Sequence, residues 1–177
     1  MVCLILTAAG VLGGLPVDSV GPLDAALVDS HDRPVRLAEF RGKPLVLFYE
    51  DRGSSEQNAP LKRALHDRAG HGPLTRAAHV LGVANVAAYD FWPVREFALS
   101  AIRDIERRDG VRILVDWRRA LLAAPFSLPD AASSVVLLDA EGRWVHAWSG
   151  PLGERSTEEF FEALGRLVEG AAEAAGP

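Results

Sequence analysis

The most restrictive feature of this sequence is the run LVLFYE at residues 45–50, which is apolar at every position before its final glutamate. A strand with one solvated face alternates apolar and polar side chains, whereas an unbroken apolar run is typical of a strand that is covered on both faces. We therefore expect residues 45–50 to form the central strand of a sheet that lies between other elements.

The segments around this run predict further strands. The sequence AALVDSHDRPVRL contains two short β-prone runs separated by the polar residues 30–33, which predicts a hairpin. Residues 77–86 and 111–116 are apolar enough to form two more strands. Close to the C-terminus, SSVVLLDAEGRWVHAWSG predicts a second hairpin whose turn is residues 139–142.

A helix is expected directly after the central strand, over residues 54–69. Its start is marked by Ser54 and by Gln57 three positions later, a capping box that satisfies free amide groups at a helix N-terminus. Pro60 lies inside this segment and should kink the helix, because proline cannot donate a main-chain hydrogen bond.

Two further helices are predicted, one over residues 93–108 and one that begins at a capping box of Ser156 and Glu159. The alternation of strands and helices implies parallel neighbours with right-handed crossovers, and the second hairpin adds antiparallel strands. The predicted fold class is α/β, with a mixed central sheet, an N-terminal hairpin and helices on both faces. The expected apolar stripes are Phe97, Ile102 and Ile105 in the first helix, and Phe160, Leu164, Leu167 and Val168 in the second.

We divide the chain into an apolar N-terminal segment at residues 1–20, one domain at residues 21–170 and a loose C-terminal tail at residues 171–177. The apolar stretch at residues 2–16 is short for a membrane span and lacks the basic start of a secretory signal. It is either a clipped signal peptide or an apolar arm packed on the domain, so a periplasmic and a cytoplasmic location both stay open. In either case residues 1–16 should add little to the folded core.

Charge and composition exclude several classes of function. The 177 residues carry a formal net charge of −5, which leaves no general electrostatic footprint for nucleic acid. Basic side chains gather at residues 103–112, but acidic side chains lie among them, which favours a solvated helix face over a binding patch. The single cysteine, Cys3, excludes an intramolecular disulfide, and the five histidines show no metal-ligand spacing. We therefore predict no metal, no cofactor and no stable membrane span.

Long stretches of the chain, over about residues 22–168, resemble the thioredoxin-like superfamily and its redoxin-type domains. They are LVDSHDRPVRLAEFRGKPLVLFYE, VRILVDWRRALLAAPFSL and SSVVLLDAEGRWVHAWSGPL. The resemblance implies a thioredoxin-like three-layer sandwich. Within the superfamily, EDRGSSEQNAPLKRAL and SSVVLLDAEGRW are most similar to the YtfJ-like branch of bacterial proteins, a branch without a settled function.

The residues that redox members of this superfamily use are missing here. Those proteins place Cys-x-x-Cys at the N-terminus of the helix after the central strand, where the loop of this chain reads DRGSSE. Two ways of counting, from Pro60 and from Phe48, put either Arg52 and Ser55 or Gly53 and Glu56 at the two cysteine positions. Neither supplies sulfur, and a hydroxyl cannot replace a thiolate in disulfide exchange.

A second hallmark, the cis-proline before the hairpin strand, is also absent, because Ser133 holds that place. The resemblance implies that residues 52–55 and 132–134 lie close together. Arg52, Ser54 and Ser55 would then lie at a helix N-terminus, where free amides attract anions, so these residues and Ser133 are candidates for binding glutathione or an anion. Alternatively, Ser54 only caps the helix.

The leading hypothesis is a redox-inactive thioredoxin-like domain that serves as a binding or accessory module, with another protein or a peptide as partner. The alternative is an enzyme or ligand-binding protein that uses the helix N-terminus, and thiol antioxidant activity ranks third. Trp144, His146 and Trp148 share one strand face by their spacing, and they either pack in the core or belong to a protein-binding surface. The oligomeric state stays open.

Overall fold

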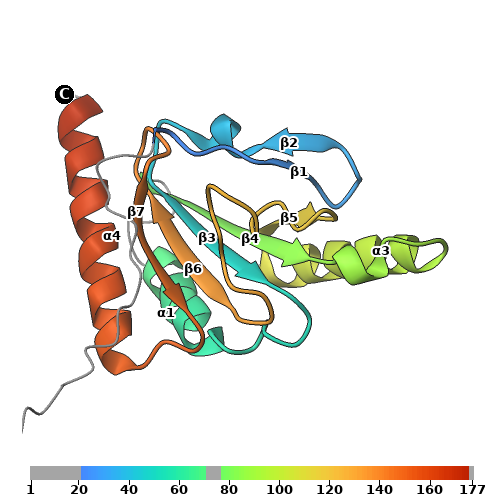
Figure 1. The fold of residues 1–177 in the computed structure, drawn as a ribbon. Helices are drawn as coiled ribbons and strands as arrows, with labels where there is room; N and C mark the ends of the chain where they lie inside the picture. Colours follow the sequence, from blue (N-terminus) through green and yellow to red (C-terminus); the bar gives the residue numbers. More distant parts are fainter. Residues whose placement is uncertain (1–20, 71–76, 176–177) are drawn as a thin grey trace, which may run out of the picture.

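The computed structural model describes residues 21–70 and 77–175, and a seven-stranded mixed sheet forms its centre (Figure 1). The order across the sheet is β2-β1-β5-β4-β3-β6-β7. Strands β3, β4 and β5 run parallel, and the other neighbouring pairs are antiparallel. The α/β class, the mixed sheet and the N-terminal hairpin are therefore confirmed. The strands are β1 (Ala26–Val28), β2 (Pro34–Arg36), β3 (Leu45–Glu50), β4 (His79–Asn85), β5 (Arg112–Asp116), β6 (Ser134–Leu138) and β7 (Trp144–Ser149).

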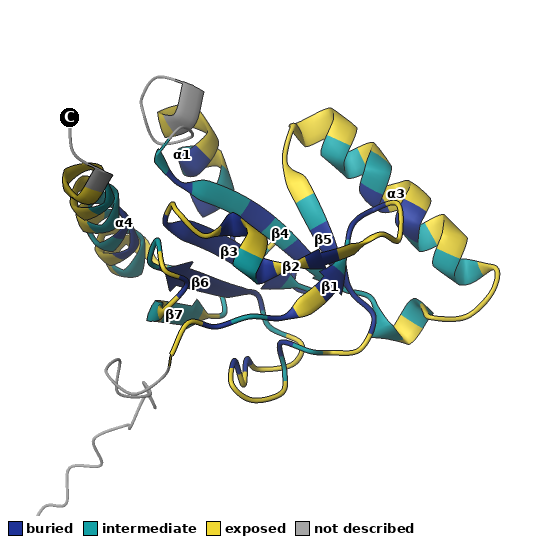
Figure 2. Cartoon of the chain, turned by 90° about the horizontal axis from the view of Figure 1, so that it is seen from above, coloured by how far each residue is buried: buried dark blue, intermediate teal, exposed yellow. Residues whose placement is uncertain are grey.

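Strand β3 is the central strand that the apolar run predicts. It pairs with β4 on one side and β6 on the other, and its first five residues are buried. Leu45, Leu47 and Tyr49 point to one face of the sheet, whereas Val46 and Phe48 belong to the cluster on the opposite face. Figure 2 shows this layer as the buried interior of the molecule. The unbroken apolar sequence is thus explained by two packed faces.

Helices α1 (Ala59–Gly70) and α4 (Glu154–Ala175) cover the face of the sheet that carries Val46 and Phe48. Leu61 and Leu65 of α1 and Phe160 and Leu164 of α4 supply the buried side chains. Helix α3 (Val94–Asp109) packs on the same face further along the sheet, where its buried side chains Leu99 and Ile102 meet Val115 of β5.

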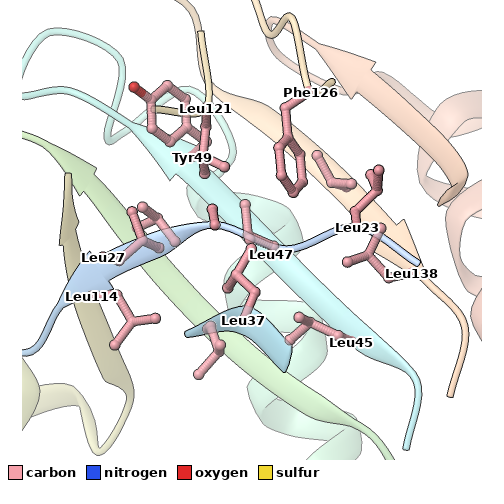
Figure 3. Close-up of a cluster of buried hydrophobic side chains, with 14 of the residues drawn as sticks. Leu23, Leu27, Leu37, Leu45, Leu47, Tyr49, Leu114, Leu121, Phe126 and Leu138 are labelled. Atoms are coloured by element: carbon pink, nitrogen blue, oxygen red, sulfur yellow. The ribbon is translucent and has the colours of Figure 1, made fainter. Parts of the chain in front are cut away.

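The opposite face is covered by irregular chain and by short helical turns. On this face the structure describes the 3-10 helix η1 (Leu37–Phe40). Leu121 and Phe126, from the segment after β5, pack beside Leu47 and Tyr49 (Figure 3). A second 3-10 helix, η2 (Ala87–Tyr89), follows β4. Of the predicted helices on both faces, the described residues thus place α1, α3 and α4 on one face and the short helix η1 on the other.

The start of α1 differs from the prediction. Residues 52–58 form consecutive turns, and the helix begins at Ala59, five residues later than expected. The main-chain N–H of Gln57 bonds to the carbonyl oxygen of Ser54, so the expected capping box is not formed. Pro60 is the second residue of the helix, where the missing N–H has no partner to lose, so it opens the helix instead of kinking it.

Helix α3 has the predicted length but a different apolar face. Leu99 and Ile102 are buried, Ile105 is half-buried, and Phe97 is 70% exposed, so its place on the predicted stripe is wrong. The helix ends where Gly110 adopts a φ of 65° and donates its N–H to the carbonyl of Glu106. This left-handed conformation favours glycine and explains the boundary.

Helix α4 begins earlier and ends later than the sequence predicts. Its first residue is Glu154, and the N–H of Thr157 bonds to the carbonyl of Gly153, so the capping box at Ser156 is wrong. The helix continues through residues 171–175, which the sequence analysis assigned to a loose tail. The apolar stripe is confirmed: Phe160 and Leu164 are buried, and Leu167 and Val168 pack against the same cluster.

Strand β7 contains a register shift that changes the direction of one tryptophan. His146 pairs with Leu137 and Trp144 pairs with the next residue, Leu138, which marks a β-bulge. Trp144 consequently packs against the cluster of Leu47, and Trp148 against that of Phe48 on the opposite face. The prediction that Trp144, His146 and Trp148 share one face is wrong, because a bulge breaks the period of two.

Candidate functional site

The C-terminal ends of the parallel strands meet at one edge of the sheet, where open α/β sheets bind their ligands. The loop after β3 and the residue before β6 lie at this edge, because β3 and β6 are antiparallel neighbours that pair Tyr49 with Ser134. Side chains from three segments make a connected set here, which we name the polar cluster: Glu50, Gln57, Asn58, Lys62 and Ser133.

Ser133 is the centre of the polar cluster and is fully buried. Its hydroxyl donates to Oε1 of Glu50 at 2.8 Å and accepts from Nδ2 of Asn58 at 2.8 Å. Its N–H donates to Oε1 of Gln57 at 3.0 Å, and its carbonyl accepts from the N–H of Gly150 at 2.8 Å. Every polar atom of Ser133 therefore has a partner inside the protein.

Asn58 extends the cluster to the segment after β7. Its side-chain amide also donates to the carbonyl of Gly150 at 3.0 Å, and its oxygen accepts from the N–H of Leu152 at 2.9 Å. The side chain is 1% exposed, so these bonds replace water entirely. Asn58 thus ties the start of α1 to both ends of the second hairpin.

An ion pair closes the other side of the polar cluster. Nζ of Lys62 lies 2.6 Å from Oε2 of Glu50 and donates to the carbonyl of Ser55 at 2.8 Å. The carboxylate of Glu50 therefore accepts from Ser133 with one oxygen and from Lys62 with the other. Both charges are compensated, so the cluster has the character of a structural network.

Ser54 is buried, but it does not cap α1. Its hydroxyl donates to Oδ1 of Asp51 at 2.8 Å and accepts from the N–H of Asp51 at 3.0 Å. The hydroxyl of Ser54 and its N–H, which donates to the same Oδ1 at 2.8 Å, hold the pKa of Asp51 below its ordinary value. The alternative that Ser54 caps the helix is wrong, because the pair closes a turn five residues before Ala59.

The four predicted ligand-binding residues are not arranged as one cradle. Ser133 contacts Glu50, Gln57 and Asn58, whereas Ser54 and Ser55 bond within their own loop, Ser55 to the carbonyl of Arg52 at 3.3 Å. Arg52 is exposed, and its guanidinium forms no ion pair with the residues that the structure describes. Whether this loop binds a ligand stays a prediction.

A second buried polar pair lies beside the cluster. The hydroxyl of Tyr49 donates to Oδ2 of Asp116 at 3.2 Å, and Asp116 also accepts from the N–H groups of Arg118, Ala120 and Leu121. Burial, together with the negative charge of Asp116, raises the pKa of Tyr49. Asp116 thereby fixes the segment that covers the Tyr49 face of the sheet.

Sequence reasoning placed Ser133 correctly before the hairpin strand but missed its partners. No sequence motif connects Ser133 to Glu50, Gln57 or Asn58, because these hydrogen bonds span more than seventy positions of the chain. The sequence did contain one signal of this network, the charge of Glu50 at the end of a buried strand. A charge at such a place requires a cation or hydrogen-bond donors nearby.

The described residues contain neither a metal-binding group nor a membrane-spanning helix. No group of three or more His, Cys, Asp or Glu side chains there could hold a metal ion. Nor does the described part of the chain contain a helix with the length and apolar character needed to cross a membrane.

Comparison with known proteins shows which fold the chain has. No family model and no curated protein matches the chain. Among solved structures, the exposed lipoprotein thioredoxin of Streptococcus pneumoniae is similar with a TM-score of 0.59 and 18% identity, covering 82% of this chain and 100% of that one. A putative thiol:disulfide interchange protein of Chlorobium tepidum has a TM-score of 0.58 and 12% identity over 84% and 95% of the two chains. A secreted Mycobacterium tuberculosis disulfide oxidoreductase has a TM-score of 0.54 and 18% identity, covering 81% of this chain and 96% of that one.

The class that the fold defines is therefore thioredoxin-like, as the sequence resemblance implied. At identities of 12–18%, these similarities establish the fold alone.

Proposed function

We propose that this chain is a thioredoxin-like domain that performs no dithiol chemistry and acts as a binding or accessory module. The observation that carries the proposal is the polar cluster, in which Ser133 is fully buried and fully hydrogen-bonded at the place of the cis-proline. Disulfide exchange needs a thiolate, and the only cysteine of the sequence is Cys3, which lies outside the described residues.

The face that we propose for a partner is the loop edge of the sheet. The loop after β4 lies at the same edge as the loop after β3, since the two strands are parallel and pair Glu50 with Ala84. It carries Phe91 and Trp92, whose exposed fractions are 56% and 85%. Exposed aromatic side chains are frequent anchors of protein interfaces, so an apolar peptide segment is the partner chemistry that fits.

The names of the similar structures favour a different function. They describe thioredoxins and disulfide oxidoreductases, and thiol antioxidant activity stays a third proposal on that basis. In this chain that chemistry would depend on Cys3 alone. Membership of the YtfJ-like branch likewise stays a proposal, and it adds no chemistry of its own.

The redox question is tested by insulin reduction and peroxide consumption with the full chain and with Cys3→Ser. We expect neither protein to exceed the uncatalysed background, because no pair of thiols can exchange a disulfide. Turnover that disappears in Cys3→Ser would overturn the proposal.

The binding face is tested by selecting peptides from a random display library on the immobilised full chain. We expect the selected peptides to be apolar. Their affinity for Trp92→Ser should be at least about tenfold lower than for the wild type, because the variant has lost one interface anchor. Val111→Ser is the matched control, because Val111 is 38% exposed but precedes β5 at the opposite edge of the sheet. Equal losses in both variants would show that the loop edge is not the binding face.

The exposed guanidinium of Arg52, which forms no ion pair with the described residues, favours a second candidate, a glutathione or anion site formed with Ser54 and Ser55 in the turns before α1. A thermal-shift measurement with glutathione and phosphate tests it. If this candidate is right, Arg52→Ala abolishes the shift and barely changes stability, because the side chain is exposed. A shift that Arg52→Ala retains would exclude it.

A further inference from the structure

A hollow outside the polar cluster is lined by side chains of α3 and of the turn that joins β1 and β2. It has a volume of about 460 Å³ and is lined by His31, Arg103, Glu106 and Arg107. We call it the α3 hollow. It is open to solvent, and three of its four lining side chains, His31, Arg103 and Arg107, have hydrogen-bond donors.

The wall of the α3 hollow is held in place by Glu106. Its Oε2 accepts from the hydroxyl of Ser30 at 2.5 Å, and its Oε1 accepts from the N–H of Ile113 at 2.8 Å. Ser30 is 2% exposed, and its carbonyl accepts from Nη1 of Arg103 at 2.7 Å. Glu106 is thus occupied in joining the turn, α3 and β5, and the donors around it are organised before any ligand arrives.

The basic side chains of the α3 hollow have hydrogen-bond donors that remain available for a ligand. Arg103 forms no ion pair with any residue in the described ranges, although it is half-buried. Within the described ranges Arg107 pairs with Asp104 and donates from Nε to the carbonyl of Arg103. Both side chains of the ion pair are more than 60% exposed, so it contributes little and can be exchanged. His31 is exposed, with Nδ1 3.4 Å from the hydroxyl of Ser30.

We propose that the α3 hollow binds the phosphate group of a small phosphate monoester, with Arg103, Arg107 and His31 as donors. A phosphate monoester offers three terminal oxygens to three donors, and guanidinium groups bind such oxygens in pairs. The sequence indicates only a solvated helix face at residues 103–112. The fold adds the turn of residues 30–31, which is distant in the sequence, and turns part of that face into a walled site.

The proposal is tested by titrating the full chain, labelled with ¹⁵N, with phosphoserine, inorganic phosphate and sodium chloride at constant ionic strength. We expect saturable shifts at the amides of residues 30–32 and 103–107, with phosphoserine binding more tightly than inorganic phosphate because the hollow exceeds one phosphate group. Arg107→Gln should weaken phosphoserine binding at least about tenfold, the loss of one charge-assisted hydrogen bond.

Arg108→Gln is the matched control, because Arg108 is adjacent, exposed and paired with Asp109, and it does not line the α3 hollow. It should leave phosphoserine binding unchanged. Equal weakening by Arg107→Gln and Arg108→Gln would mean diffuse attraction to a basic surface and would overturn the proposal. So would shifts no larger than those of sodium chloride, or inorganic phosphate binding as tightly as phosphoserine.

Discussion

One buried side chain, Asn58, joins three segments of this molecule. Its amide group bonds to the hydroxyl of Ser133, to the carbonyl of Gly150 and to the N–H of Leu152. These three hydrogen bonds depend on one another, because water does not reach the amide of Asn58, which is 1% exposed. Asn58 is therefore a stabilising contact between the start of α1 and the second hairpin.

Asn58→Ala should therefore be strongly destabilising. The substitution leaves the carbonyl of Gly150 and the N–H of Leu152 without that partner, at a cost of about 3 kcal/mol of unfolding free energy. Urea unfolding followed by circular dichroism measures it. Ser55→Ala is the control and should cost little, because that half-buried hydroxyl bonds, among the described residues, to the carbonyl of Arg52 within the same turn. A similar cost for both variants would contradict the assigned role.

A pH dependence is expected from Asp29, a buried carboxylate in the first hairpin turn. Burial raises its pKa, but the side chain of Arg33 and the N–H groups of Arg33 and His31 outweigh burial and lower the pKa to about 2. A lowered folded-state pKa adds stability above the unfolded value near 4, and that stability is lost as the pH falls towards 2.

The difference in unfolding free energy between the wild type and Asp29→Asn isolates this contribution. It should be largest above about pH 4, where the charge of Asp29 adds about 2 kcal/mol, and it should shrink by that amount by about pH 2. Denaturant unfolding at a series of pH values provides the measurement. A difference that is independent of pH would show that the Asp29 charge is not stabilised in the folded state.

At the scale of elements, sequence patterns were sufficient wherever local chemistry decides the structure. Apolar runs located β3, β4 and β5, and turn residues located both hairpins. Helix starts were misplaced because side-chain pairs that resemble capping boxes found other partners: Gln57 bonds to Ser133. The bulge that turns Trp144 to the opposite face has no local signal, since it depends on the register with β6.

The apolar face of α4 leads to a prediction at this scale. Phe160 is fully buried and meets Trp148 and Phe161 edge-on, with ring centres 5.6 and 5.1 Å apart. Phe160→Ala should lower the unfolding free energy by about 3–5 kcal/mol, because a large cavity remains between α4 and the sheet. Glu162→Ala, two residues away and 70% exposed, should change it by less than about 0.5 kcal/mol. Comparable losses in thermal denaturation would mean that α4 is not docked by this face.

At the scale of the whole molecule, the thioredoxin-like fold and the absence of its thiols were both evident from the sequence. The place of Ser133 followed from counting within the hairpin segment. The network around it did not, because Glu50 and Asn58 reach Ser133 only after β3 and β6 have paired. The same limit applies to the α3 hollow, whose walls come from a turn and a helix more than seventy positions apart. Such sites form only when distant strands pair, so they depend on the topology of the fold and cannot be predicted from sequence periodicity.

The last prediction concerns residues 1–16, which lie outside the described residues. Because the ends of a chain usually add little to a folded core, we expect that removing residues 1–16 leaves Tm nearly unchanged. Leu23→Ala is the contrasting variant, because this side chain is 4% exposed and its N–H donates to the carbonyl of Gly142 at 2.7 Å. Each 1 kcal/mol lost shifts Tm by about 2–4 °C in a chain of this size, so Leu23→Ala should lower Tm by several degrees in scanning calorimetry. If the truncated chain loses as much as Leu23→Ala, the N-terminal segment is part of the folded core, and the domain boundary at residue 21 is wrong.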